Sequence, residues 1–211
     1  MRLILAVTLA LAGLSTAGRA QPVMQTITLP AAPPPVSVTL DHATTALVLL
    51  DMSNVTCLPQ KICMEQMLPR VRDLLARARA AGMMVVYTHP NRPNVSILPE
   101  VAPQPGEKVL IPDAQDKFYG SSLEADLKAR GVTHVVLAGW RMNGSVVYTS
   151  VGATLRGFTV VVVQDASLAP SEADIAIGRC QAMTQLSANE TNAKLKPHAT
   201  TLSLASEITF R

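Results

Sequence analysis

Short apolar runs recur along the chain, and a stretch with helical spacing separates each run from the next. Apolar runs without charge are typical of strands buried on both faces of a sheet. The runs fall at residues 45–50, 84–88, 133–138 and 159–163, with a weaker one at 200–204. Helices are predicted between them, at residues 64–81, 122–130, 145–156 and 171–186. This alternation predicts an α/β fold of three layers, with helices on both faces of a mainly parallel sheet.

The first 20 residues differ in character from the rest of the chain. Arg2 is followed by an uncharged apolar stretch at residues 3–14 and then by small residues, which is the order of a secretory signal peptide. The apolar stretch is too short for a membrane span, which needs about 20 residues. We therefore expect residues 1–20 to be a cleaved signal peptide and the mature protein to be periplasmic or secreted. A proline-rich arm at residues 21–40 and one domain at residues 41–211 are predicted to follow.

Charge and composition narrow the set of partners. The formal net charge of +3 falls to +1 once the two arginines of the first 20 residues are removed, and aromatic residues make up 3% of the chain. Such a chain lacks the basic surface and the stacking platforms of nucleic-acid-binding proteins. We expect a small-molecule substrate or ligand as the partner, with no nucleic acid and no membrane span in the mature form.

The three cysteines are Cys57, Cys63 and Cys180. Export would place them in an oxidising compartment, and the short spacing from Cys57 to Cys63 favours a local disulfide over a reactive thiol. Cys180 is expected alone and buried on a helix. No histidine lies at ligand spacing from the cysteines, which disfavours a zinc site.

Polar residues follow the predicted strands, and in parallel sheets ligands bind outside the carboxyl ends of the strands. These residues are Asp51, His89, the segment 139–145 and Asp165. A carboxylate at the end of a buried strand is costly to ionise unless it is paired, so Asp51 suits a general acid or base, although it could also cap a turn. The proline-rich segment at residues 90–112 is long for a connection and is predicted to form a lid.

Ser145 lies between a predicted strand and a predicted helix. The backbone N–H groups at such a helix start can hold an anion, and the hydroxyl can act as a nucleophile, contact a ligand or cap the helix. The surrounding sequence is not a G-x-S-x-G motif, because Asn143 stands at the first glycine position. Lys117 is open to two interpretations, a partner of Asp51 or a surface lysine, and spacing alone favours the surface.

Several segments together resemble the isochorismatase-like hydrolases, also called cysteine hydrolases. They occur in the order found in that family, at residues 46–54, 78–88, 116–123, 131–139 and 143–165. The resemblance implies a three-layer α/β fold with a Rossmann-type topology and a pocket at the strand ends. It also implies a homo-oligomer.

The resemblance assigns catalytic positions and shows two departures from the family. Members use an Asp, a Lys and a Cys. Asp51 matches the aspartate, but Ser145 stands where the cysteine is expected. The lysine normally precedes the D-x-F-Y-G block by four residues, which is the position of Pro112; Lys117, inside the block, and Lys108 are displaced candidates.

The resemblance also implies the surroundings of the catalytic residues. A cis peptide is expected near Arg141-Met142, with the N–H groups of Met142 and Ser145 forming an oxyanion hole. The residues expected to bind substrate are His89, Trp140, Arg141, Met142 and Asn143. The metal-binding Asp/His cluster of the nicotinamidase branch has no counterpart here, so neither a metal nor another cofactor is expected.

These departures bear on function. Amide hydrolysis in the family needs a thiolate, whereas vinyl-ether hydrolysis needs only an acid and water, so the loss of cysteine favours the latter. The leading hypothesis is an exported hydrolase with Asp51 as general acid/base, Ser145 in contact with substrate or water, and Lys117 as a charge partner. The missing lysine favours the alternative, a catalytically inactive small-molecule-binding protein on the same fold. A third option is a subunit that acts only through oligomer contacts.

Overall fold

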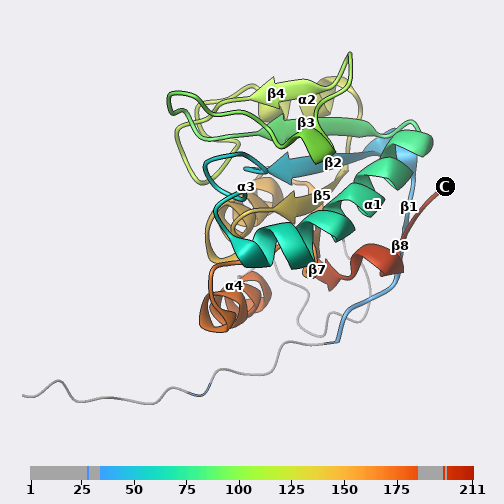
Figure 1. The fold of residues 1–211 in the computed structure, drawn as a ribbon. Helices are drawn as coiled ribbons and strands as arrows, with labels where there is room; N and C mark the ends of the chain where they lie inside the picture. Colours follow the sequence, from blue (N-terminus) through green and yellow to red (C-terminus); the bar gives the residue numbers. More distant parts are fainter. Residues whose placement is uncertain (1–27, 29–33, 185–196, 198) are drawn as a thin grey trace, which may run out of the picture.

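The computed structural model describes residues 28, 34–184, 197 and 199–211. Its centre is a six-stranded sheet in the order β4-β3-β2-β5-β6-β7, and every neighbouring pair of strands is parallel (Figure 1). The strands are β2 (Thr45–Leu50), β3 (Met84–Thr88), β4 (Lys108–Leu110), β5 (His134–Gly139), β6 (Thr159–Val163) and β7 (Thr200–Ser203). The expected α/β fold with a mainly parallel sheet is confirmed.

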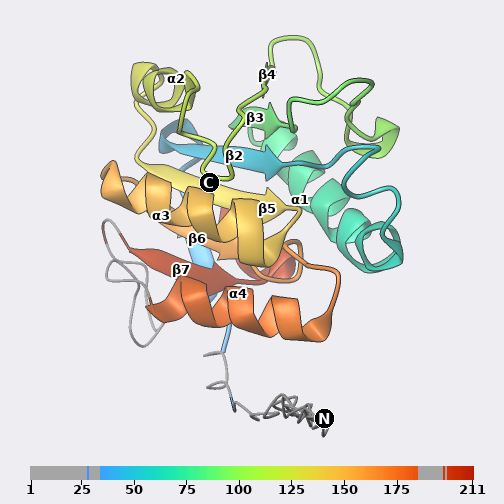
Figure 2. The ribbon, with the colours of Figure 1, turned by 90° about the vertical axis from the view of Figure 1, so that its left-hand side faces the viewer.

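Four α-helices lie within the described residues. Their bounds are α1 (Leu68–Ala80), α2 (Leu123–Ala129), α3 (Val147–Leu155) and α4 (Glu172–Thr184). Figures 1 and 2 show α1 on one face of the sheet and α3 and α4 on the other, which completes the three layers. Helix α1 is preceded by a π-helical turn at Cys63–Met67. Helix α3 is preceded by a kinked turn at Met142–Val146, in which Asn143 and Gly144 are not helical.

Strand β4 lies within the segment predicted to be a lid. It has only three residues, and two of them are exposed. A short edge strand of this kind carries neither the apolar run nor the alternation from which strands are predicted. The segment is therefore partly built into the sheet, although its two ends still border the pocket described below.

The end of the predicted proline-rich arm joins the domain. Strand β1 (Val38–Leu40) pairs in parallel with β8 (Ile208–Phe210) in a separate two-stranded sheet. The predicted signal peptide and most of the arm fall outside the described residues. In the part of the chain that is described, no helix is both long enough and apolar enough to cross a membrane.

The contact between β2 and β5 brings two strand ends close together. All six residues of β2 are buried, and its last residue, Leu50, pairs with Gly139 at the end of β5. Gly139 has a φ of +129°, and a Cβ atom there would lie 2.1 Å from the carbonyl oxygen of Leu50. Only glycine fits this approach, which places Asp51 and Trp140, the residues that follow the two strands, at one edge of the sheet.

Candidate active site

Asp51 is held in a left-handed backbone conformation directly after β2. Its φ is +53°, which is uncommon for a residue other than glycine. Two backbone hydrogen bonds fix the turn: Asp51 N donates to Thr88 O at 2.9 Å, and Ser53 N donates to Asp51 O at 2.9 Å. The side chain is only 8% exposed, and it borders a cavity. An uncommon backbone conformation held in this way is a feature of functional sites.

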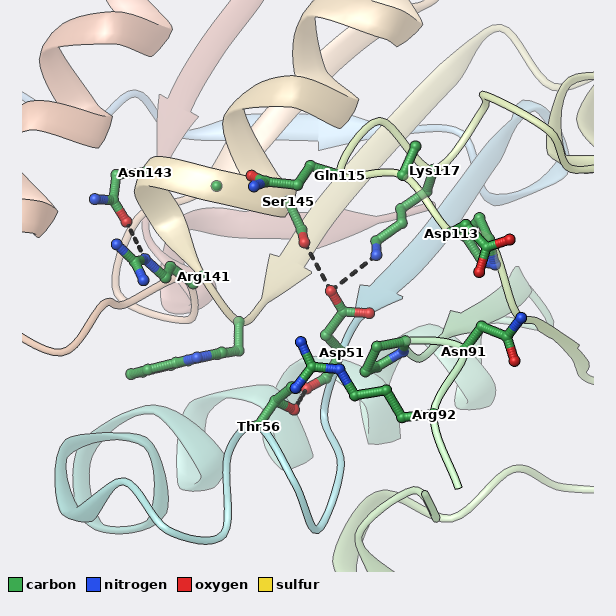
Figure 3. A pocket seen from close by; sticks show the side chains of 15 residues that line it. Asp51, Thr56, Asn91, Arg92, Asp113, Gln115, Lys117, Arg141, Asn143 and Ser145 are labelled. Atoms are coloured by element: carbon green, nitrogen blue, oxygen red, sulfur yellow. Dashed lines mark hydrogen bonds and ion pairs between the residues drawn. The ribbon is translucent and has the colours of Figure 1, made fainter. Parts of the chain in front are cut away.

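The Asp51 carboxylate is the centre of a polar cluster. Lys117 Nζ lies 3.0 Å from Oδ2, and the Ser145 hydroxyl donates to the same oxygen at 2.7 Å (Figure 3). Thr88 donates its hydroxyl to Oδ1 at 3.2 Å. One ammonium group and two hydroxyl groups therefore satisfy the oxygens of this buried carboxyl group.

Lys117 is a buried partner of Asp51 and not a surface lysine. It is 3% exposed, and its backbone is fixed by a hydrogen bond from Lys117 N to Thr149 Oγ1 at 3.2 Å. The preference for the surface, drawn from spacing, was therefore wrong. Although Pro112 occupies the position expected for the family lysine, the displaced Lys117 still brings an ammonium group to the aspartate. Lys108, the other candidate, pairs with Asp126 at 2.6 Å.

Ser145 lies in the kinked turn that leads into α3. Its hydroxyl donates a hydrogen bond to Asp51, and the start of α3 has no side-chain cap. The interpretation of Ser145 as a helix cap is therefore not supported. Sequence reasoning found no base beside Ser145, because the carboxylate that it contacts is 94 residues away.

The turn before Ser145 differs in two details from what the resemblance implies. The cis peptide joins Trp140 and Arg141, one residue earlier than expected. The N–H of Met142 donates to Leu168 O at 2.9 Å, so it is not available to an oxyanion, and that part of the expected oxyanion hole is wrong.

A cavity of about 490 Å³ opens over the polar cluster. The loops that follow β2, β3, β4 and β5 form its walls. Its lining consists of Asp51, Thr56, Pro90, Asn91, Arg92, Pro112, Asp113, Ala114, Gln115, Lys117, Trp140, Arg141, Asn143, Gly144 and Ser145. Loops beyond the carboxyl ends of parallel strands form the ligand site in this class of fold.

Six of the eight residues predicted for the site line this cavity. His89 and Met142 do not: His89 Nδ1 lies 3.0 Å from the carbonyl oxygen of its neighbour Pro90, and Met142 is fully buried in the core. Asp165, the polar residue after β6, accepts a hydrogen bond from Ala205 N at 2.8 Å and pairs with Arg70 at 3.2 Å, so it ties together structural elements away from the cavity.

The lining also contains polar residues that sequence reasoning did not single out. They are Thr56, Asn91, Arg92, Asp113 and Gln115. All of them lie on connections after strands. The rule that ligands bind at strand ends points to these segments, but it does not say which of their side chains turn inward.

The disulfide between Cys57 and Cys63 is confirmed. It lies next to Thr56, whose hydroxyl donates to the carbonyl oxygen of Asp51. Cys180 is a free thiol on α4, as expected, but it is half-buried and not fully buried. Among the described residues, no group of three His, Cys, Asp or Glu side chains has the arrangement of a metal site.

Comparisons with known proteins agree with this architecture. Residues 45–191 match the model of the isochorismatase domain family. A ureidoacrylate amidohydrolase, RutB of Caulobacter segnis, is 25% identical over 189 residues, which cover 67% of this chain and 78% of that protein. A streptothricin hydrolase of Streptomyces noursei is 33% identical over 112 residues, or 48% of this chain and 44% of that protein.

Solved structures show the same fold. A cysteine hydrolase from Pseudomonas syringae superposes with a TM-score of 0.66 at 20% identity, over 84% of this chain and 96% of that one. An N-carbamoylsarcosine amidase from Thermoplasma acidophilum gives a TM-score of 0.59 at 21% identity, over 77% of this chain and 96% of that one. Because the family model covers more than half of the sequence and the fold agrees, this chain belongs to the isochorismatase family of hydrolases.

Proposed function

We propose that the chain hydrolyses a small polar molecule, with Asp51 as the general acid/base. The observation that carries the proposal is the position of Asp51: a buried carboxyl group bordering a cavity, in contact with both an ammonium group and a hydroxyl group. A carboxyl group in this setting can exchange a proton with a bound molecule and with water in turn. Lys117 positions the carboxylate and offsets its charge.

Vinyl-ether hydrolysis is the reaction that we favour. In that reaction Asp51 gives a proton to the carbon of the vinyl-ether double bond, water adds to the resulting oxocarbenium ion and returns a proton to the Asp51 carboxylate. The neutral hemiketal then separates into a ketone and an alcohol, with breakage of the bond between the former vinyl carbon and the ether oxygen. No covalent nucleophile is needed, so a serine in place of the cysteine does not prevent it. This reaction requires that the Asp51 carboxyl group carry a proton when the substrate is bound.

A second reaction is favoured by one contact. The Ser145 hydroxyl is already hydrogen-bonded to Asp51 at 2.7 Å, which is the arrangement of a nucleophile and a base. Ser145 could then attack an amide, the bond class named in the ureidoacrylate amidohydrolase relative. A carboxylate is a weak base for a serine hydroxyl, so we rank this reaction below the addition of water.

The test is a product screen on the purified protein. We would incubate it with a panel of small vinyl ethers, ureides and amides and look for hydrolysis products by mass spectrometry. We expect at least one substrate to be cleaved by the wild type and not by Asp51→Asn, with both proteins folded by circular dichroism. Tight retention of a panel compound without any product would instead support a protein that binds and does not catalyse.

We also propose that the protein works outside the cytoplasm after removal of residues 1–20. The disulfide supports this, because such bonds persist in oxidising compartments. Cell fractionation, together with the N-terminal sequence of the mature protein, tests it. The expected homo-oligomer stays a prediction, which a measurement of solution mass would check.

A further inference from the structure

The turn that follows Asp51 is held together by hydrogen bonds to two carbonyl oxygens. Ser53 O accepts from three backbone N–H groups at 2.9–3.3 Å, those of Thr56, Cys57 and Leu58. Asp51 O accepts from Ser53 N at 2.9 Å and from the Thr56 hydroxyl. Thr56 is therefore bonded to the turn through both its backbone and its side chain.

The Thr56 hydroxyl acts directly on the backbone of the acid/base residue. Asp51 has a φ of +53°, a conformation that a residue other than glycine keeps only where its surroundings hold it. The two donors on the Asp51 carbonyl oxygen fix the peptide group that follows, and the backbone rotation fixed in this way sets where the side chain points. Thr56 also lines the cavity beside Asp51 (Figure 3).

The disulfide ties this turn to helix α1. Cys57 directly follows Thr56, and its partner Cys63 is the first residue of the π-helical turn that leads into α1. Both cysteines are fully buried, whereas none of residues 58–62 between them is buried. A covalent link restricts the conformations that such a surface segment can take. The disulfide therefore keeps Thr56 in contact with Asp51.

We propose that Thr56 is a positioning residue for Asp51 and that the disulfide holds Thr56 in place. The site then reaches its working geometry only when Cys57 and Cys63 are oxidised. This rests on the proposed function, because Asp51 is the acid/base that is positioned.

Oxidation of the two cysteines is a thiol–disulfide exchange. The two S–H bonds of the cysteines and the S–S bond of a disulfide oxidant break, and the bond between Cys57 and Cys63 forms. The oxidant takes up the two electrons and the two protons and leaves as two thiols. Oxidants of this class act where exported proteins fold, whereas the cytoplasm keeps thiols reduced. The proposal thus couples activity to export: a copy kept in a reducing compartment has the acid but not the turn that positions it.

The first test needs no substrate. We would measure amide hydrogen exchange by mass spectrometry on a peptide covering residues 51–58 and on one covering β5, which reports on the fold as a whole. Thr56→Val keeps the shape of the side chain and removes the hydroxyl. We expect exchange in residues 51–58 to become about three- to tenfold faster, the range of one hydrogen bond, with β5 unchanged. Thr56→Ser keeps the hydroxyl and should exchange like the wild type.

A second arm tests the disulfide. The oxidised chain should contain one titratable thiol, from Cys180, and the fully reduced chain three. Reduction by dithiothreitol should speed exchange in residues 51–58 at least as much as Thr56→Val does, and should leave β5 protected. The double variant Cys57→Ala/Cys63→Ala should do the same without dithiothreitol. Cys180→Ala is the matched control, and it should behave like the wild type both before and after reduction.

Kinetics on a substrate from the product screen separate positioning from support of the fold. Thr56→Val and the double cysteine variant should lower kcat per folded molecule by about three- to tenfold. KM should stay near the wild-type value, because the other walls of the cavity are unchanged. Thr56→Ser should restore kcat.

Two sets of results would overturn the proposal. Exchange in residues 51–58 that is unchanged in Thr56→Val, or as fast in Thr56→Ser as in Thr56→Val, removes the role of Thr56. A double cysteine variant that exchanges like the oxidised wild type, or that also loses protection in β5, removes the local role of the disulfide. The exchange results do not depend on turnover, so they decide this inference even if the product screen finds no substrate. Conversely, cleavage of a substrate with unaltered exchange leaves the proposed function standing and this inference refuted.

Discussion

Two ion pairs, one buried and one partly buried, contact the same strand, and they differ in what surrounds them. Thr88 of β3 contacts the Asp51–Lys117 pair, whereas its neighbour Tyr87 contacts a pair formed by Arg79 and Glu107. Adjacent residues of a strand point to opposite faces of the sheet. The two pairs have similar separations, 3.0 Å for Lys117–Asp51 and 2.8 Å for Arg79–Glu107.

The Arg79–Glu107 pair belongs to a network of hydrogen bonds within the protein. Arg79 donates to both carboxylate oxygens of Glu107, to the Tyr87 hydroxyl and to the carbonyl oxygen of Ala102, each at 2.8 Å. Burial, followed by the charge of Glu107, raises the pKa of Tyr87 well above its usual range. Burial is the largest single influence and opposes ionisation of Glu107. The hydrogen bonds from Arg79, from the backbone of Gln104 and from Tyr87, together with the charge of Arg79, outweigh it and hold the pKa of Glu107 below its ordinary value.

The two pairs differ in their position relative to the cavity. Asp51 and Lys117 line it, and none of Arg79, Tyr87 and Glu107 does. A charge withdrawn from water is therefore not a sufficient mark of a functional site, because a structural network also holds partly buried charges. We expect loss of the first pair to reduce turnover, and loss of the second to reduce stability.

Lys117→Gln is expected to have the largest effect, which is a loss of catalysis. Without the ammonium group the acid/base residue is neither positioned nor balanced in charge, so we expect turnover to fall about 100-fold or more. The measurement is the rate of product formation on the substrate found in the screen. Lys128→Gln, which removes an exposed lysine paired with Glu124, is the control and should keep the wild-type rate. A Lys117→Gln protein within a fewfold of wild type would remove the distinction between the two pairs.

Arg79→Gln should show the opposite pattern. It leaves the Glu107 carboxylate partly buried without its main partner. We expect the free energy of unfolding to fall by about 2–3 kcal/mol, below the range for fully buried pairs because both side chains retain some exposure. Denaturant titration measures this. Turnover per folded molecule should stay near that of the wild type, and a large loss of turnover would show that the network acts on the site.

Ser145→Ala is expected to have a smaller effect on the reaction. If Ser145 only holds water or substrate, turnover should fall about tenfold, the equivalent of one hydrogen bond to a charged group. Single-turnover kinetics would measure it. A loss of a thousandfold or more, together with a covalent adduct in the wild type detected by mass spectrometry, would instead identify Ser145 as a nucleophile.

The smallest expected effect is the pH dependence contributed by Glu107. Because its pKa is lowered in the folded protein, Glu107 contributes stability above its ordinary pKa of 4.5, and that contribution is lost as the pH falls through the folded value. The difference in unfolding free energy between wild type and Glu107→Gln should therefore shrink as the pH is lowered below about 4.5. A difference that stays constant from neutral to acid pH would argue against the linkage.

Sequence reasoning was most successful where one local signal decides the structure. The apolar run of β2 predicts a buried strand, and the rule for parallel sheets then places Asp51 at its carboxyl end. The disulfide also follows from a local feature, the spacing between Cys57 and Cys63. Strand β4 escaped prediction because it is short, half-exposed and located at the edge of the sheet.

Contacts between distant residues could not be predicted in the same way. Lys117 and Ser145 are 66 and 94 residues away from Asp51 in the sequence. The periodicity of apolar residues does not indicate such long-range contacts. Position after a strand was also insufficient, since His89 and Asp51 both follow strands and only Asp51 lines the cavity. The direction in which a loop residue points depends on turns such as the one that carries Thr56, which spacing does not encode.

The most direct measurement compares the rates of Asp51→Asn and Glu107→Gln on one substrate. Both substitutions neutralise a carboxylate that is paired with a cation, without a large change in shape. We predict that Asp51→Asn loses product formation by about 100-fold or more while it stays folded, and that Glu107→Gln retains the wild-type rate despite a lower melting temperature. Equal rates for the two variants would contradict the assignment of Asp51 as the reacting acid/base.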